Sequence, residues 1–397
     1  MVTGIRNQFN ASFTADKYAA FLDDLNHRFP GAIDFRVAET PVFIEKELGR
    51  QMIDTCEYII DFIKTAGFLS LTDRAIPKQE YMRNQNDHSH FIAFDFGICE
   101  DENGGHYPAL IEMQGFPTLF GFQAYYPAVL EKHFEIPKGY ATFFNGINQA
   151  SYVELLKEVI IGNNKTEEVI LLEIKPHQQK TRIDFYCTKE LLGINIVCIT
   201  ELIKEGRNLY YLNNGTKTRI SRIYNRVIAD ELNAIKDQLG DIIEFTDDLA
   251  VEWIPHPHWF YRISKFTLPY LHHPCIPETQ FLHEVKTLPS DLENYVLKPL
   301  FSFAGQGVVI DLTKEDLERI QDPENWILQR KVKYADCIQT PDDPAKVEVR
   351  LMYVWKDGDD RPTLVTNLAR LSKGKMIGVR YNKDKEWVGG SVAFFEQ

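Results

Sequence analysis

The sequence predicts a mixed α+β chain with a small, doubly wound α/β domain in its middle. Three observations predict this fold class. An apolar run at 169–174 is followed by a helical segment and a second apolar run, which is the pattern of a βαβ unit. Two strand-like segments flank the turn sequence Asn103-Gly104-Gly105, as in an antiparallel hairpin. Two further strand-like segments flank a glycine-containing loop just after residue 300.

Length, charge and cysteine content narrow the class of protein. The 397 residues are enough for about two or three domains with a substantial core. A net charge of −13 argues against a nucleic-acid partner, which would require a clustered basic surface. The sequence shows no signal peptide and no membrane-spanning run. Its six cysteines form no CxxC pair, so no zinc knuckle or dithiol motif is predicted. We expect a cytoplasmic protein without a membrane partner.

The first region, residues 1–165, is expected to mix helices with one hairpin. Residues 14–29 have one apolar face, which predicts a helix. Thr40 followed by Pro41 is typical of a helix start, so a second helix is expected from there to Gly67. Residues 90–99 and 109–114 are rich in aromatic and β-branched side chains, and we expect them to form the two strands of the hairpin.

The second region, residues 166–250, is expected to form the small α/β domain. The run at 169–174 is almost entirely apolar, as in a parallel strand buried on both faces. A helix is expected at about 181–192, ended by Gly193, with the next strand at 194–199. Strand, helix and strand at this spacing predict a Rossmann-like unit.

The third region, residues 251–397, contains the glycine loop. A strand at 295–299 carries Lys298, and a second strand is expected at 308–311. Gly305 and Gly307 would let the backbone approach an anion closely, and Lys298 would place a compact positive charge beside it. The loop matches neither a P-loop nor a Rossmann loop. A plain hairpin with glycines in its turn remains an equal alternative.

Six loose motifs follow one another in this part of the chain. They are Ser264-Lys265 before a helical stretch, Ile276-Pro277-Glu278-Thr279, the strand ending in Lys298-Pro299, the glycine loop, Leu328-Gln329, and Glu348-x-Arg350 on an alternating strand. This order resembles the ATP-grasp fold, in which two α+β subdomains hold ATP between two sheets. The resemblance therefore implies ATP as the cofactor.

The resemblance also implies roles for individual residues. Lys265 and Lys298 would bind phosphates, and Arg350 would approach them. The loop would close over the phosphates, and the adenine would lie at a hinge. The implied loop residues are Ser302, Gly305, Gln306 and Gly307, and the implied hinge residues are Gln329, Arg330 and Lys331.

The predicted hairpin carries three candidate magnesium ligands. Glu112 and Gln114 lie two residues apart on one strand, so their side chains share a face. Asp95 lies on the partner strand among apolar and aromatic neighbours, where a lone buried carboxylate would be costly without a cation. Carboxylate and amide oxygens suit Mg²⁺. The alternative is an alternating strand with incidental polar residues.

The segments 94–96, 110–114 and Pro117-Thr118 resemble the circularly permuted ATP-grasp enzymes, such as glutathionylspermidine synthase. In these enzymes the metal-binding strands precede the nucleotide lysines. The resemblance implies that residues 1–165 supply metal-binding strands, 166–250 a substrate domain, and 251–397 the nucleotide-binding subdomains. The sequence departs from the family at Gln114, where the family has asparagine, and at Ala93, where it has arginine. Arg83 or Arg226 is a candidate replacement for that arginine.

The resemblance implies an ATP- and Mg²⁺-dependent ligase that joins a carboxylate to an amine through an acyl phosphate. Its substrates would be small or peptide-like. Two alternatives stay open: a phosphotransferase on the same fold, and an ATP-binding protein that has lost catalysis. Arg222, Arg226 and Arg370 are candidates for holding a substrate carboxylate, although each could be a surface ion-pair residue. His88 and His90 share a face and are either metal ligands or ordinary polar residues.

Overall fold

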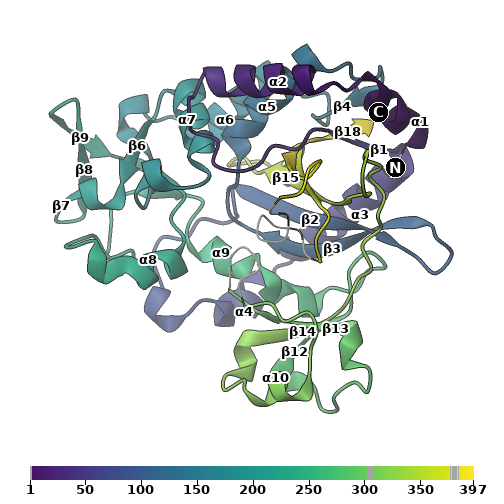
Figure 1. Ribbon diagram of the computed structural model, residues 1–397. Helices are drawn as coiled ribbons and strands as arrows, with labels where there is room; N and C mark the ends of the chain where they lie inside the picture. Colours follow the sequence, from purple (N-terminus) through teal and green to yellow (C-terminus); the bar gives the residue numbers. More distant parts are fainter. Residues whose placement is uncertain (1, 302–306, 376, 378–381, 383) are drawn as a thin grey trace.

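A five-stranded antiparallel sheet lies at the centre of the molecule (Figure 1). The computed structural model describes residues 2–301, 307–375, 377, 382 and 384–397. Strands from the two ends of the sequence share this sheet. In spatial order they are β17 (Gly389–Ser391), β16 (Thr363–Ser372), β15 (Lys346–Val354), β2 (Phe91–Glu100) and β3 (His106–Gln114).

The predicted hairpin is confirmed as β2 and β3, and the pairing of these strands determines which side chains share a face. Asp95 lies opposite Glu112 on β3 and opposite Arg350 on β15. On the next strand pair, Glu348 lies opposite Arg370. Directly opposed residues in a sheet project to the same side. Five charged side chains from β2, β3, β15 and β16 therefore converge on one face.

The other face of the sheet is apolar and is covered by helix α3 (Lys46–Ile63). Met52, Ile59 and Ile60 of α3 pack in one buried cluster with Phe94 and Phe96 of β2. Burial of such side chains contributes about 1.5–3 kcal/mol each. Because Phe94 and Phe96 flank Asp95 in sequence, their burial directs Asp95 to the polar face.

The prediction that a helix starts at Thr40-Pro41 is wrong. Residues Val42–Ile44 instead form β1, which pairs in parallel with β18 (Ala393–Glu396). The helix α3 begins only at Lys46. The pairing of two distant segments has overridden the local start signal. The third strand of this small sheet is β4 (Tyr140–Ala141).

The predicted βαβ unit is confirmed. Strand β5 (Val169–Glu173), helix α7 (Arg182–Leu192) and strand β6 (Asn195–Cys198) follow one another, and Gly193 ends the helix in a left-handed conformation with φ 76°. This parallel sheet continues through β10 (Arg222–Asn225) and β11 (Glu252–Ile254). A second small sheet, which was not predicted from the sequence, lies in this region and consists of β7 (Ile203–Glu205), β8 (Asn208–Asn213) and β9 (Thr216–Ile220).

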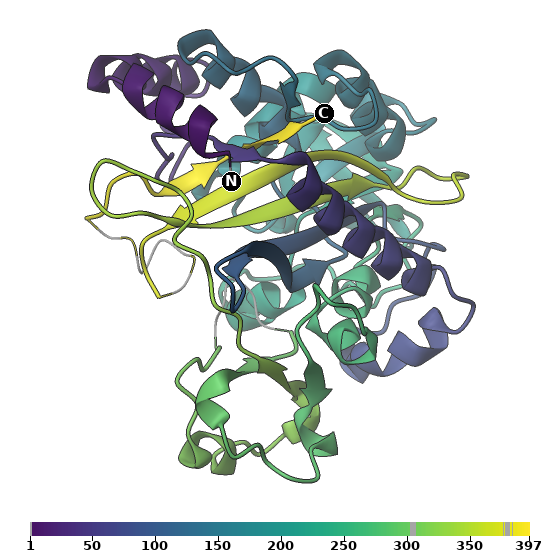
Figure 2. The ribbon, with the colours of Figure 1, turned by 90° about the vertical axis from the view of Figure 1, so that its right-hand side faces the viewer.

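A separate lobe hangs below the central sheet in Figures 1 and 2. It contains β12 (Thr279–Phe281), β14 (Trp326–Arg330), β13 (Tyr295–Pro299) and helix α10 (Lys314–Glu318). The strand expected at 308–311 is reduced to one isolated bridge between Val309 and Leu297. Lys265 begins a 3-10 helix, Lys265–Tyr270, that packs beside β3 and β12.

The remaining helices surround these sheets. They are α1 (Thr3–Ser12), α2 (Ala15–His27), α4 (Phe68–Thr72), α5 (Phe120–His133), α6 (Gln149–Ile160), α8 (Ala229–Ile235) and α9 (His258–Arg262). The helix predicted at 14–29 is confirmed as α2, and the Thr14 hydroxyl caps it by accepting the N–H of Lys17. Within the described ranges, no helix is both long and apolar enough to cross a bilayer.

Candidate functional site

The polar face of the central sheet is organised around Asp95, which is 2% exposed. One carboxylate oxygen of Asp95 accepts the Nε–H of Arg350. The other accepts Nη2–H groups of Arg350 at 2.5 Å and of Arg370 at 2.7 Å. Burial alone would raise the pKa of Asp95, but the two guanidinium charges hold it below its ordinary value. The carboxylate is therefore ionised and shared by two arginines.

Glu348 extends this network on the next strand. It accepts the Nη2–H of Arg370 at 2.9 Å and the hydroxyl of Tyr334. Burial raises the pKa of Glu348, and Arg370 opposes that effect. The Tyr334 ring reaches Glu348 by lying against Gly97, where a Cβ atom would come within 2.6 Å of it. Gly97 therefore allows the tyrosine to close one end of the network.

Glu112 lies between the arginines and the lysines. Its side chain is 30% exposed. One of its carboxylate oxygens lies 3.9 Å from Nζ of Lys265, and the other lies 3.9 Å from Nη2 of Arg350. Both contacts of Glu112 are thus longer than a hydrogen bond, and its carboxylate stays partly exposed.

The two lysines reach the site from separate segments. Lys298, on β13, donates to the carbonyl oxygen of Ile111 at 3.1 Å and to Oε1 of Gln329 at 2.6 Å. Burial lowers the pKa of Lys298 to about 8, although the nearby charge of Glu112 opposes this shift. Burial also lowers the pKa of Lys265. The predicted phosphate lysines therefore meet beside β3 and the predicted ligand Glu112.

The residues predicted for the adenine hinge fall into two groups. Gln329 is buried, and its amide group joins Lys298 to the hydroxyl of Thr279. Arg330 and Lys331 are more exposed: Arg330 pairs with Asp291 and Lys331 donates to the carbonyl oxygen of Glu293. Gln329 thus connects three of the sequence motifs, whereas the other two side chains lie at the periphery.

The glycine loop is described only at its end. Gly307 has φ 76°, and a Cβ atom there would lie 3.0 Å from Pro299. Glycine suits this left-handed conformation. The other predicted loop residues, Ser302, Gly305 and Gln306, lie outside the described residues.

The three predicted magnesium ligands lie on neighbouring strands but differ in availability. Both oxygens of Asp95 bind arginines. Gln114 is half-buried, and its Nε2 lies 3.5 Å from the carbonyl oxygen of Phe116. Among the described residues, no three His, Cys, Asp or Glu side chains form a group suited to a metal ion. Glu112 and the amide oxygen of Gln114 remain suitable donors for an ion that is also held by phosphates.

Arg226 pairs with a carboxylate that is not part of the network on the polar face. It is buried next to β10 and forms an ion pair with Asp184 of α7. Asp184 also accepts the backbone N–H of Phe122 at the start of α5. The structure brings Arg350 and Arg370 to Asp95 but gives Arg226 a partner elsewhere. Arg222 likewise pairs with Glu252 and Asp357, not with Asp95.

Sequence analysis missed Glu348, Tyr334 and Asp184. Glu348 stands two residues before Arg350 on a strand with alternating polarity, so the shared face was a usable signal. Tyr334 lies beyond β14 in a segment without a pattern, and nothing in the sequence marked it.

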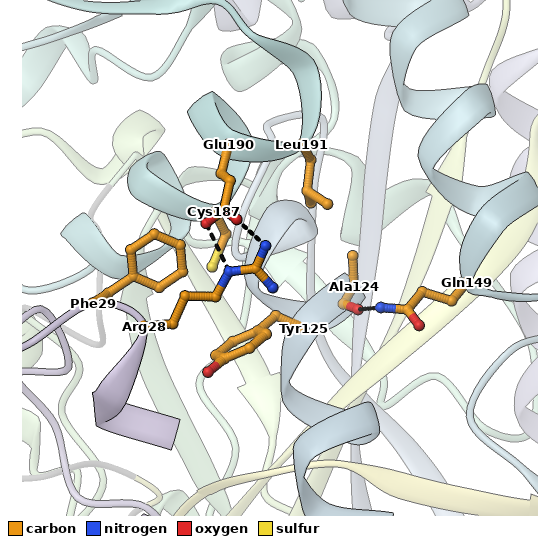
Figure 3. Close-up of a pocket in the computed structure, with 8 residues that line it drawn as sticks. All are labelled: Arg28, Phe29, Ala124, Tyr125, Gln149, Cys187, Glu190 and Leu191. Atoms are coloured by element: carbon orange, nitrogen blue, oxygen red, sulfur yellow. Dashed lines mark hydrogen bonds and ion pairs between the residues drawn. The ribbon is translucent and has the colours of Figure 1, made fainter. Parts of the chain in front are cut away.

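A hollow lies away from this site, between α2, α5, α6 and α7 (Figure 3). It is lined by Arg28, Phe29, Ala124, Tyr125, Gln149, Cys187, Glu190 and Leu191. The guanidinium group of Arg28 is paired with Glu190 inside it, with Nε 2.8 Å from Oε2. Its lining includes none of the residues predicted for ATP, magnesium or substrate.

Comparison with known proteins supports the architecture. No model of a protein family matches the sequence, and no curated protein does. The solved apo structure of a glutathione synthetase-like effector from Globodera pallida is similar over 96% of both chains, with a TM-score of 0.55 and 10% sequence identity. At this identity the likeness concerns the fold alone. The chain is thus a mixed α/β protein with a glutathione synthetase-like fold.

Proposed function

We propose that this chain is an ATP-grasp enzyme of the circularly permuted kind, which uses ATP and Mg²⁺ to join a carboxylate to an amine. The observation that carries the proposal is the convergence of Lys265, Lys298 and Arg350 on Glu112. Lys265 and Arg350 each lie 3.9 Å from a Glu112 oxygen, and Lys298 binds the carbonyl of the preceding residue. These residues come from segments far apart in sequence, and their positive charges suit a polyphosphate.

The oxygen donors near these cations fit one magnesium ion. Mg²⁺ is usually held by one or two carboxylates together with substrate phosphates and water. Glu112 would hold it by its carboxylate and Gln114 by its amide oxygen. When bound, Mg²⁺ would neutralise part of the negative charge on the phosphates.

The residues of the site would position the reactants and stabilise charge. A substrate carboxylate oxygen attacks the γ-phosphorus of ATP, the bond to the β-phosphate oxygen breaks, and ADP leaves. The amine then attacks the acyl carbon, loses its proton, and inorganic phosphate leaves. Lys298 and Lys265 would bind the phosphates, while Arg350 and Arg370 would offer fixed N–H donors to the charge that spreads over the transferring group.

Phosphate release with pooled substrates tests the reaction class. We expect the protein, incubated with ATP, Mg²⁺, carboxylates and amines, to release phosphate only when both kinds of acceptor are present. Phosphate that remains on a single substrate would favour a phosphotransferase. Nucleotide binding without any turnover would favour an ATP-binding protein that has lost catalysis. Ala93, which stands where the family has arginine, motivates this alternative.

Two substitutions test the residues. Lys298→Met removes a phosphate contact, so we expect ATP binding measured by calorimetry to weaken at least ~10-fold. Glu112→Gln keeps the shape of the side chain but removes the charge that holds Mg²⁺. We expect it to abolish magnesium-dependent turnover while the circular dichroism spectrum stays unchanged. Full turnover by Glu112→Gln would contradict the metal assignment.

A further inference from the structure

We propose that Asp95 holds no metal ion and instead fixes Arg350 and Arg370, whose guanidinium groups take the place of a second metal ion beside the triphosphate. The inference rests on the proposed function, because it states how many metal ions that site uses. It departs from the expectation that Asp95, Glu112 and Gln114 act together as magnesium ligands.

The hydrogen bonds of Asp95 exclude a metal ion from its oxygens. A carboxylate has about four acceptor sites. Three N–H groups occupy three of these sites, two from Arg350 and one from Arg370, and Asp95 is only 2% exposed. A metal ion would have to displace a guanidinium group and would then lie beside two fixed positive charges. Both changes oppose binding.

Both oxygens of the second buried carboxylate on this face also have hydrogen-bond partners. Glu348 binds Arg370 on one oxygen and Tyr334 on the other. Glu112 differs, because its nearest charged partners are 3.9 Å away and it is 30% exposed. Among the described side chains of this sheet face, Glu112 is therefore the accessible carboxylate, which suits one metal ion.

The register of the sheet places Arg350 on the same face as Ala93 and Asp95. Ala93 stands where the resembling enzymes have arginine, and it lies opposite Met352 on β15. Two residues before Met352, Arg350 projects to the same face as Asp95. A guanidinium group held by its own carboxylate is preorganised, so it can meet developing charge without reorienting. Asp95 is thus a positioning residue.

Counting metal ions in the unmodified protein tests the inference directly. The probe is Mn²⁺ with a nonhydrolysable ATP analogue at saturation, followed by electron paramagnetic resonance of free Mn²⁺. We expect about one Mn²⁺ per bound nucleotide. Two Mn²⁺ per nucleotide would overturn the inference. Absence of nucleotide binding would defeat the proposed function, and the stability test below would then decide the role of Asp95.

A pair of variants separates a counterion from a metal ligand in the metal-free protein. A carboxylate kept for a metal repels its neighbours when the metal is absent, so its amide variant should be at least as stable as the parent. We expect the opposite for Asp95→Asn: two buried guanidinium groups lose their counterion, and Tm falls by about 5 °C or more. Glu112→Gln, the matched control, should leave Tm within about 2 °C.

Binding and kinetics complete the comparison. We expect Glu112→Gln to lower Mn²⁺ affinity at least ~10-fold and Asp95→Asn to leave it within about twofold. In Asp95→Asn we expect kcat to fall about 10-fold or more while KM for ATP changes less, because the arginines are present but no longer fixed. An Asp95→Asn variant that keeps its Tm and loses Mn²⁺, or one that keeps its kcat, would overturn the inference. Should it not fold, the Mn²⁺ count on the unmodified protein decides.

Discussion

Lys298 is buried, although its proposed role in phosphate binding requires a positive charge. Because burial lowers its pKa to about 8, the free protein loses this positive charge just above neutral pH. We expect kcat/KM for ATP to fall about tenfold per pH unit above pH ~8, since kcat/KM follows the ionisation of the free enzyme. The measurement is a pH profile of initial rates at low ATP.

The pH dependence of stability has the opposite sign to that of kcat/KM. Unfolding therefore does not explain the loss of activity above pH ~8. The folded-state pKa of Lys298 lies below the ordinary lysine value of 10.5, and the unfolded chain therefore binds this proton more tightly. The contribution of Lys298 to the free energy of unfolding rises as pH increases from about 8 to 10.5. In the control Lys298→Arg the charge persists, and the fall near pH 8 should disappear. An unchanged fall would contradict the assignment to Lys298.

Arg226 and Asp184 form a buried pair whose loss should affect stability before activity. Asp184 is fully buried and Arg226 almost so. Arg226→Met leaves the Asp184 charge without its partner, so we expect a loss of about 3–5 kcal/mol in the free energy of unfolding by urea. The double variant Arg226→Met with Asp184→Asn should recover part of it. A raised KM for ATP with normal stability would instead place Arg226 at the ATP site.

The sequence identified residue types better than their partners. Lys265, Lys298, Glu112 and Arg350 stood in motifs that resemble the ATP-grasp family, and the structure brings them together. Sequence did not reveal that Asp95 binds arginines, because that depends on β15 lying next to β2. Such a pairing joins positions 255 residues apart, and no local pattern records it.

At the scale of elements, Gly97 shows how a strand makes room for a side chain from elsewhere. A Cβ atom at Gly97 would lie 2.6 Å from the Tyr334 ring. We expect Gly97→Ala to displace Tyr334, to break its hydrogen bond to Glu348, and to cost about 1–3 kcal/mol. Urea unfolding measures this cost.

A matched glycine provides the control for this prediction. Gly67 precedes α4 with φ −85°, and a Cβ atom there meets nothing within 4 Å. Gly67→Ala should therefore change the free energy of unfolding by less than about 0.5 kcal/mol. Equal effects of the two substitutions would show that Tyr334 does not need the space at Gly97.

Helices and strands were predictable where the local sequence alone determines them. The hairpin β2–β3 and the unit β5–α7–β6 follow from apolar periodicity and turn residues, and both are confirmed. β1 was missed because its three residues gain their strand conformation from pairing with β18, about 350 residues later in the chain. The strand expected at 308–311 formed only one bridge. Short segments are decided by distant partners.

For the whole molecule, Asp357 links the central sheet to the parallel α/β sheet. It lies in the turn after β15, and its two oxygens accept hydrogen bonds, one from Nε2 of His90 at 2.9 Å and one from Nη2 of Arg222 at 3.1 Å. The hydrogen bond from His90, aided by Arg222, lowers the pKa of Asp357 to about 2. A Cβ atom at Gly162 would lie 2.0 Å from the Arg222 guanidinium, so this glycine leaves space for the link.

His88 makes this junction sensitive to acid. It stacks on Trp355 with ring centroids 4.4 Å apart, and burial together with His90 lowers its pKa to about 4. The folded protein thus keeps His88 neutral at pH values where the unfolded chain protonates it. The contribution of His88 to the free energy of unfolding should fall by about 2–3 kcal/mol as pH decreases from 6.5 to 4. Urea unfolding at several pH values measures this slope.

Substitution of His88 isolates its share of the acid sensitivity. His88→Gln removes the titrating ring, so the slope between pH 6.5 and 4 should become shallower even if stability at pH 7 also falls. His272→Gln, at an exposed histidine, should leave the slope unchanged. Since Asp357 stays ionised down to pH ~2, its link to Arg222 persists in this window. A slope unaffected by His88→Gln would place the acid sensitivity of the molecule outside this junction.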